Sequence, residues 1–327
     1  MAFAKSAASL VEFKMQESVA QSPISQALTM NASDNEILDH PYGDLSGGMW
    51  LRGNLHTHTN LSDGCRPPQE VISDYKERGY DFLMISDHDV FASSEHLKQW
   101  DAAEMILIPG NEISAGGCHI LHVNAGTNVS PHTPRQVVLS DIAQDPQSFS
   151  IIAHPNWMSR FDYATVNQLK EWIGYAGIEI YNGVIGSHDG SPYATNKWDI
   201  LLGQGYRFWG YANDDSHRAE HVALGWNQVY VRERTLSAVV HALVHGRFYA
   251  STGVEIDNIA VQGRQIRIET SNADRIVALC NTGRRFRQVD ARTMEVEVPS
   301  EANYVRFECW GRGEAMAWTQ PFYVRNG

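Results

Sequence analysis

The hydrophobic and polar positions divide the chain into two parts that have different periods. Between residues 50 and 253, short apolar runs alternate with helix-like segments, as where the amphipathic segment 68–79 ends at a glycine and the apolar run 81–86 follows it. Further apolar runs, each bounded by polar or turn residues, lie at 105–108, 119–123, 150–153, 176–180 and 208–212. Repeated strand-and-helix units of this kind predict a parallel sheet or a barrel.

After residue 253, apolar and polar residues alternate with a period of two. This part predicts antiparallel strands that bury one face. We therefore expect an N-terminal arm with weak periodicity (residues 1–48), an α/β domain (49–253) and a small all-β, sandwich-like domain (254–327). The alternating runs of the last part lie at 266–269, 276–279, 294–298, 304–308 and 322–324.

The composition and charge of the chain restrict its class and its partners. The hydrophobic fraction of 43% and the charged fraction of 20% are ordinary for a globular protein, and no apolar run reaches the roughly 18 residues of a membrane helix. The net charge of −12, without a cluster of Lys and Arg, argues against nucleic acid as the main partner. Charged residues interrupt the N-terminal segment and the four cysteines form no C-x-x-C pair, so we expect a cytoplasmic protein without a secretory signal.

Residues that can bind a metal ion follow the predicted strands in a regular order. His56 and His58 lie two residues apart on an extended segment, so their side chains point to the same side. Asp63 follows in a Ser-Asp-Gly turn that can return it to the same site. Later strands are followed or led by further candidates. The complete set of six imidazoles and three carboxylates is His56, His58, Asp63, His88, Glu112, His119, His154, Asp215 and His217.

Nine ligands are more than one ion requires. Nitrogen and oxygen donors of this kind hold zinc, manganese or iron, with about four to six ligands per ion including water. The set therefore predicts two or three divalent metal ions that share a bridging carboxylate. One position stays open, because His119 and His122 lie three apart on a presumed strand and face opposite sides, and a β-bulge would exchange them.

The order of these motifs resembles the PHP family, named after the polymerase and histidinol phosphatase proteins that share it. The motifs are His-x-His, Ser-Asp-Gly, Asp-His, Gly-x-Glu, a strand led by His, Ala-His-Pro and Asp-x-His, over about residues 50 to 250. The resemblance implies a distorted (β/α)7 barrel, here followed by the all-β part. The stretch 179–183 and the β-rich tail also resemble the carbaryl-hydrolase-like branch of that family.

The resemblance also implies how the ligands are shared. It places His56, His58, Glu112 and Asp215 on one ion, Glu112, His119 and His154 on a second, and Asp63, His88 and His217 on a third. Family spacing favours His119 over His122. The usual Gly-Ser-Asp-x-His reads Asn213-Asp214-Asp215-Ser216-His217 here, so the spacing favours Asp215 but leaves Asp214 open.

The implied function is that of a metal-dependent hydrolase, most simply a phosphoesterase acting on a small phosphomonoester or phosphodiester. In this hypothesis a hydroxide that bridges the metals attacks phosphorus at a centre formed by Glu112 and Asp215, and Arg218 neutralises phosphoryl oxygens. Asp214 or His188 protonates the leaving group. Arg52, Arg160 and Lys197 are further cations near motif residues.

Two other functions remain open from the sequence. The same metal centre suits a carboxylic ester, carbamate or amide. Alternatively, the α/β part is a non-catalytic metal-binding scaffold and the β-rich tail is a binding module. Otherwise the tail packs against the barrel or forms a homo-oligomer interface.

Residues beside the ligands are expected to support them. Asp87 and Asp89 flank His88 and either orient its imidazole or lie in a solvated turn. Glu179 ends an apolar strand, which favours a role beside the ligands or the substrate over a structural ion pair. His154 precedes Pro155, which predicts an extended backbone.

Overall fold

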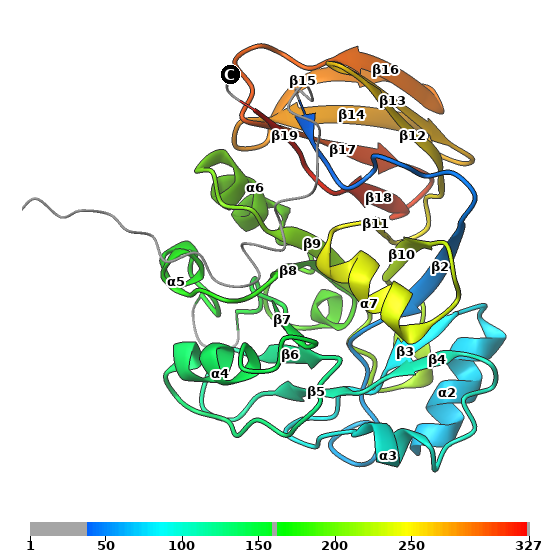
Figure 1. The fold of residues 1–327 in the computed structure, drawn as a ribbon, viewed down its shortest axis with the longest axis vertical. Coiled ribbons are helices and arrows are strands. Elements are labelled where there is room, and N and C mark those ends of the chain that lie inside the picture. The colour runs from blue at the N-terminus through cyan, green and yellow to red at the C-terminus, as the bar shows by residue number, and fades with distance from the viewer. Residues whose placement is uncertain (1–37, 159–161, 326–327) are drawn as a thin grey trace, which may run out of the picture.

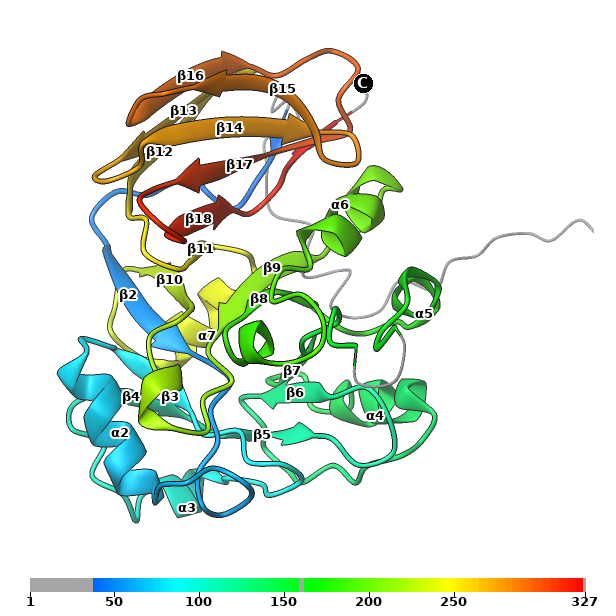
Figure 2. The same cartoon turned by 180° about the vertical axis from the view of Figure 1, so that it is seen from behind.

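The computed structural model describes residues 38–158 and 162–325 of the 327-residue chain. Residues 1–37 of the expected N-terminal arm, and Arg160, lie outside the described residues. The fold is mixed α/β, with many strands and few helices (Figures 1 and 2). In the described residues, no helix is long and apolar enough to cross a membrane.

The first part of the chain contains two groups of strands. In the first group, β2, β3 and β4 pair in parallel, and α2 lies between β2 and β3 in the chain. In the second group, β5 to β9 follow one another in a five-stranded sheet. The bounds are β2 (Met49–Asn54), β3 (Phe82–Met84), β4 (Ile106–Ile108), β5 (Gly110–Ile113), β6 (Ile120–Val123), β7 (Phe149–Ile152), β8 (Gly177–Asn182) and β9 (Trp209–Asn213).

The expectation of a parallel sheet throughout this part is wrong for β5 and β6. The pairs β5–β6 and β6–β7 are antiparallel, whereas β7–β8 and β8–β9 are parallel. Only residues 114–119 connect β5 to β6. A parallel connection needs a crossover of about a dozen residues or more, so this short link permits only a hairpin.

Backbone hydrogen bonds beyond the strand ends join the two groups. The amide of Asp215 donates to the carbonyl of His56 at 2.9 Å, and the amide of Ser86 donates to that of Thr57 at 2.8 Å. The amide of Glu112 donates in turn to the carbonyl of Ser86 at 3.0 Å. These bonds place the segments after β9, β2 and β3 beside β5, so residues far apart in sequence meet at one end of the strands.

The helices cover these strands from the outside. The amphipathic segment at 68–79 forms α2 (Pro68–Glu77), which buries Val71, Ile72 and Tyr75 on one face. The capping box of α5 uses Thr165 and Gln168. The other helices are α3 (Ser94–Leu97), α4 (Arg135–Ile142), α5 (Val166–Glu171), α6 (Thr195–Gly203) and α7 (Leu236–Val244), with 3-10 turns η1 (Val184–Ser187) and η2 (Ala219–His221).

The last part of the chain is built from antiparallel strands, as the period of two predicts. A three-stranded sheet has the order β12-β13-β16, and its inward residues include Ile266 and Ile268. It packs against β14, β17 and their neighbours around a separate apolar core. The strands are β12 (Ile256–Gln262), β13 (Gln265–Thr270), β14 (Arg275–Cys280), β15 (Arg284–Val289), β16 (Thr293–Glu297), β17 (Tyr304–Trp310), β18 (Met316–Thr319) and β19 (Phe322–Val324).

One sheet passes through both parts of the chain. Strand β18 pairs with β11 (Phe248–Ser251), β11 pairs with β10 (Trp226–Val231), and β10 pairs with β2, all antiparallel. At the other end, β1 (Leu38–Asp39) pairs with β19. The β-rich layers stand directly above β10, β11 and β2 in Figures 1 and 2. The β-rich part is therefore hydrogen-bonded to the part that carries the predicted ligands.

Candidate metal centre

The structure brings all nine predicted ligands together. Their ligand atoms form overlapping groups within which all atoms lie within 4.8 Å of one another. The groups are His58, Asp63, His88 and His217; His56, His58 and Asp215; His56, Glu112 and His154; and His88, Glu112 and His119. We call these nine residues the metal cluster. The side chains of His56, His58 and Glu112 are fully buried.

Glu112, on β5, lies in the middle of the metal cluster. Its Oε1 lies 2.9 Å from His119 Nδ1 and 3.2 Å from His154 Nε2. Its Oε2 lies 2.7 Å from His88 Nδ1 and 3.4 Å from His58 Nε2. Oε1 also lies 3.2 Å from His56 Nε2. The two oxygens therefore face five imidazoles, three at Oε1 and two at Oε2, which is the arrangement that a carboxylate shared by two ions requires.

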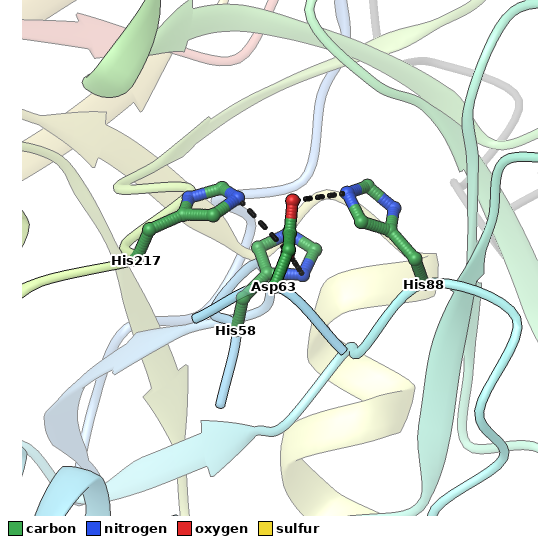
Figure 3. A group of neighbouring side chains, drawn as sticks. All are labelled: His58, Asp63, His88 and His217. Carbon is green, nitrogen blue, oxygen red and sulfur yellow. Dashed lines mark ion pairs between the residues drawn. The ribbon is translucent and has the colours of Figure 1, made fainter. Parts of the chain in front are cut away.

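On the solvent-exposed side of the metal cluster, which we call the outer side, Asp63 lies among three histidines (Figure 3). Its Oδ1 lies 3.3 Å from His217 Nε2 and 3.8 Å from His58 Nδ1, and its Oδ2 lies 3.5 Å from His88 Nε2. The side chain of Asp63 is 55% exposed, so this group opens to solvent. His58 joins Asp63, His88 and His217 here, whereas the resemblance implies only the last three.

On the buried side of the metal cluster, which we call the inner side, Asp215 lies beside His56 and His58. Asp215 Oδ1 lies 3.0 Å from His58 Nε2 and 3.2 Å from His56 Nε2. The backbone of Asp215 has a φ of 56°, in the left-handed region that most residues avoid. Such strained backbone is found at binding sites, where the surrounding structure holds it.

The charges in the metal cluster favour ionised carboxylates. Burial alone opposes ionisation of Glu112, yet the nearby imidazoles of His56 and His119 hold the pKa of its carboxyl well below the usual value. Burial likewise opposes ionisation of Asp215, and His56 and His58 hold its pKa well below the usual value. Both carboxylates are therefore in the form that binds a cation.

Several buried atoms in the metal cluster make no hydrogen bond. Buried polar atoms in folded proteins are almost always paired, so unpaired atoms that face one another indicate a missing partner. Nitrogen and carboxylate donors at this separation fit a divalent cation. The unpaired atoms include His56 Nε2 and both ring nitrogens of His58, whereas His88 Nδ1 and Glu112 Oε2 lie 2.7 Å apart as an ion pair.

Glu179, on β8, orients two of the histidines. Its Oε1 accepts from His56 Nδ1 at 2.8 Å, which turns His56 Nε2 toward the metal cluster. Its Oε2 accepts from the backbone amide of His154 at 2.7 Å. His154 has a φ of 27° and not the extended backbone expected before Pro155, and this hydrogen bond helps to hold it there.

The structure separates the alternatives that the sequence left open at His119 and His122. His119 Nδ1 contacts Glu112, whereas both ring nitrogens of His122 are buried without a hydrogen-bond partner, away from the metal cluster. Burial lowers the pKa of His122 to about 4, so this imidazole is neutral at pH 7. His122 lies on β6 opposite Asn111, whose side-chain amide also has no partner.

Asp214 is not part of the metal cluster, which corrects the prediction that it protonates a leaving group. Its Oδ1 accepts from the amides of Leu224 and Gly225, and its Oδ2 accepts from the amide of Ala223 and the hydroxyl of Tyr75. The side chain is fully buried, and burial raises its pKa to about 6. Asp214 therefore holds the loop after β9, whereas Asp215 lies in the metal cluster.

The sequence left open whether Asp87 and Asp89 orient the His88 ring or lie in a solvated turn, and in the structure their carboxylates bind neighbouring loops. Asp87 accepts from the amide and hydroxyl of Thr59 and from the hydroxyl of Ser62, in the turn that carries Asp63. Asp89 accepts from the amide and hydroxyl of Ser114 and from the amide of Ala115. The side chain of Asp87 is fully buried, so its contacts fix the turn before Asp63.

A cavity of about 540 Å³ opens at the metal cluster, and two of the predicted substrate-contacting residues line it. Arg218 and His188 lie on its wall. The other cations lie elsewhere: the Arg52 guanidinium stacks over the Trp226 ring, and Lys197 Nζ donates to backbone carbonyls. Among the described residues, the guanidinium of Arg218 makes no ion pair, so it is free to meet an anion.

The cavity wall also has an apolar part that was not predicted from the sequence. Trp157, Val184 and Ile185 line the cavity, together with Cys65 and His221. Trp157 follows the Ala-His-Pro motif by two residues, and its proximity to a predicted ligand was the available signal. The residues of η1 carry no such signal, because only the folded loop brings them to the site.

Comparisons with known proteins show the fold. No protein-family model matches the sequence, and no curated protein matches it either. The chain is similar to a two-domain protein from Bacteroides vulgatus that contains a predicted PHP-like metal-dependent phosphoesterase, with 16% identity, a TM-score of 0.52 and coverage of 90% of this chain and 92% of that chain. This likeness confirms the expected resemblance to PHP proteins at the level of the fold.

Two further solved structures have lower TM-scores. PsfC from Pseudomonas syringae has 12% identity and a TM-score of 0.44, over 61% of this chain and 89% of that chain. The lesion-specific endonuclease PfuEndoQ from Pyrococcus furiosus has 14% identity and a TM-score of 0.42, over 73% of this chain and 64% of that chain.

Proposed function

We propose that this PHP-like fold is a metal-dependent hydrolase that acts on a small phosphomonoester or phosphodiester. The observation that carries the proposal is Glu112, a buried carboxylate whose two oxygens face five imidazoles, three of which line an open cavity. A purely structural role does not explain so many buried polar atoms without partners. The free cation of Arg218 on the same wall suits an anionic substrate.

The metal cluster has enough donors for two or three divalent ions, with manganese, zinc and iron as the candidates. Divalent ions bound there would supply Lewis acidity and lower the pKa of a bound water toward neutrality. Glu112 would be shared between ions, and Asp63 and Asp215 would complete the outer and inner sites. Glu179 keeps His56 and His154 in place for this role.

Two residues of the cavity wall would act on the substrate directly. Arg218 would hold the non-bridging oxygens of the phosphoryl group by charge-assisted hydrogen bonds. His188, exposed on the wall beside η1, would donate a proton to the departing oxygen. Asp214 has no part in this step, because four donors occupy its carboxylate inside the protein.

We also propose that the first part of the chain is the distorted (β/α)7 barrel expected from the sequence. Strands β5 to β9 are paired in succession, and the hydrogen bonds of His56, Thr57 and Ser86 link β9 through β2 and β3 back to β5. Seven strands would thus form a ring, distorted where β5, β6 and β7 run antiparallel. The proposal accounts for the meeting of all nine ligands, since catalytic groups of barrels gather at one end of the strands.

An assay of the protein loaded separately with Mn, Zn and Fe tests the function. The panel contains phosphomonoesters, phosphodiesters and aryl carbamates, and we expect phosphate release or diester cleavage that Glu112→Ala abolishes. His241→Ala, an exposed histidine of α7 outside the cavity, is the matched control and should keep the activity. Carbamate turnover without any phosphoester cleavage would instead favour a hydrolase of carboxylic esters, carbamates or amides. The absence of both activities would favour the non-catalytic metal-binding scaffold.

A further inference from the structure

The cavity at the metal cluster is larger than a phosphoryl group requires and has a mixed lining. Its volume of about 540 Å³ lies in the range of sites that enclose a whole small molecule, roughly 300 to 1,000 Å³. Ligand residues and Arg218 form the charged part of the lining, and Trp157, Val184 and Ile185 form the apolar part. We call these last three residues the apolar wall.

Trp157 packs against two imidazoles that in turn contact Glu112 at the centre of the metal cluster. Its ring centroid is 5.2 Å from that of His154 and 5.8 Å from that of His119. The same two imidazoles lie 3.2 Å and 2.9 Å from Glu112 Oε1. A group attached to a phosphoryl bound at the metal cluster is therefore within reach of the indole.

Backbone contacts fix the loop that carries Trp157. Trp157 pairs with Gly190 in an antiparallel bridge, and the amide of Met158 donates to the carbonyl of Asp189 at 2.8 Å. Gly190 has a φ of 132°, and a Cβ there would lie 2.4 Å from the carbonyl oxygen of Asn156, so only glycine allows this close approach. The backbone at Trp157 is thus held by contacts other than those of the indole ring.

Other exposed hydrophobic residues belong to the loops of the metal cluster. Leu61 precedes Asp63 by two residues, Val90 follows His88 by two, and Met158 follows Trp157. All three are among the seven exposed large hydrophobic residues of the described chain. These three residues do not line the cavity themselves, but they add exposed apolar surface to segments that carry ligands of the metal cluster.

We propose that the substrate carries a planar aromatic group on its leaving-group side and that this group packs against the apolar wall. The inference rests on the proposed phosphoesterase function and adds the class of leaving group. Indole rings pack on other aromatic rings more favourably than on small alkyl groups, because stacking adds to the apolar area that is buried. Arg218 at the charged part of the lining would hold one phosphoryl group while the aromatic group occupies the remaining volume.

Binding of two phosphonates to the metal-loaded protein tests this proposal. Phenylphosphonate and methylphosphonate carry the same anionic group but differ in the aromatic ring, and isothermal titration measures both affinities. We expect the wild type to prefer phenylphosphonate by about tenfold, and Trp157→Ala to lose most of that preference. Trp157→Phe retains a ring and should retain most of it, which separates ring packing from a general disturbance of His119 and His154.

Trp310→Ala is the matched control, because Trp310 is exposed on β17 and does not line the cavity. This variant should show the wild-type preference. The same comparison is made for the hydrolysis of phenyl phosphate and methyl phosphate. Hydrolysis of both esters without aromatic preference, or a preference unchanged in Trp157→Ala, overturns this inference alone. Absence of phosphonate binding and of all phosphoester hydrolysis overturns the proposed function as well.

Discussion

The molecule contains two buried groups of charged residues that are organised in opposite ways. In the metal cluster, imidazoles and carboxylates face one another while several of their atoms lack a hydrogen-bond partner. At the junction of α6 and β17, Arg306 instead makes two bonds to Asp199, of 2.7 and 2.6 Å, and one of 3.0 Å to Glu308. Tyr304 also donates to Asp199 at 2.8 Å. We call this second group the Arg306 network.

The contrast separates a binding site from a structural contact. In the Arg306 network, no buried side-chain polar atom lacks a hydrogen-bond partner, and its bonds join the β-rich part to α6. The metal cluster concentrates ligands that burial makes unfavourable until a cation arrives. Residues of the first kind should matter for stability, and residues of the second kind should matter for metal binding and catalysis.

The largest effect is expected at the centre of the metal cluster. Glu112→Gln keeps the shape of the side chain but removes the charge that faces five imidazoles. We expect the metal-loaded variant to lose about 10³-fold in kcat/KM, while the metal-free variant unfolds in urea no more easily than the wild type. A decrease of less than about tenfold in kcat/KM would show that Glu112 is not shared by catalytic ions.

The opposite result is expected in the Arg306 network. Arg306→Met leaves the buried carboxylates of Asp199 and Glu308 without a cation, which should lower the free energy of unfolding by about 3 to 5 kcal/mol. Metal binding per folded molecule should not change. Arg284→Met is the matched control, because Arg284 pairs with Glu301 on the surface at 3.0 Å and such exposed pairs contribute about 1 kcal/mol or less. Equal losses in the two variants, measured by urea unfolding, would contradict the contrast.

The order of ligands along the chain explains why the sequence predicted the metal cluster well. His56, His58 and Asp63 lie in one short segment, and His88 and His154 each follow an apolar run, so local patterns place them at strand ends. The apolar runs and the period of two also predicted most strands and helix α2. These features depend on residues that are neighbours in sequence.

Features that depend on contacts between residues far apart in the sequence were not predicted. Pro109 and Gly110 suggest a turn, yet Gly110 begins β5 because it pairs with Val123 of β6. The side chains of Asp87 and Asp214 turn toward loops whose positions are known only after folding. The sheet that joins β11 to β18 depends on pairs such as Tyr249 with Thr319, far apart in the sequence.

A residue that only orients the ligands should have an intermediate effect. Glu179→Gln leaves the volume unchanged but introduces an amide donor opposite the amide of His154, and it weakens the hold on His56 Nδ1. We expect metal affinity, measured by competition with a chelating dye, to fall by about 10-fold to 100-fold. Glu171→Gln, an exposed residue of α5, serves as the control and should bind metal like the wild type.

His122 is a third case, because its imidazole is buried without a hydrogen-bond partner but lies outside the metal cluster. Its pKa is lowered to about 4 in the folded protein by burial and is 6.5 in the unfolded chain. As the pH falls, the unfolded chain therefore takes up the His122 proton at a higher pH than the folded protein does. The free energy of unfolding consequently decreases as the pH falls from 6.5 toward 4. Between about pH 7 and pH 5, the free energy of unfolding of the wild type should fall by about 2 kcal/mol more than that of His122→Leu.

The matching measurement is urea unfolding of both proteins at the two pH values, with metal content recorded at neutral pH. His122→Leu should bind metal like the wild type. Loss of metal in this variant would place His122 among the ligands in place of His119, and identical pH dependence of the two proteins would show that His122 titrates normally in the folded state.

Metal content decides whether the nine residues of the metal cluster bind divalent ions. Purified protein is incubated with Mn, Zn and Fe, desalted, and analysed by inductively coupled plasma mass spectrometry. We expect about two or three ions per chain in the wild type, clearly fewer in Glu112→Gln and the wild-type number in Arg284→Met. Fewer than one ion per chain with every metal, or the same content in Glu112→Gln as in the wild type, would contradict it.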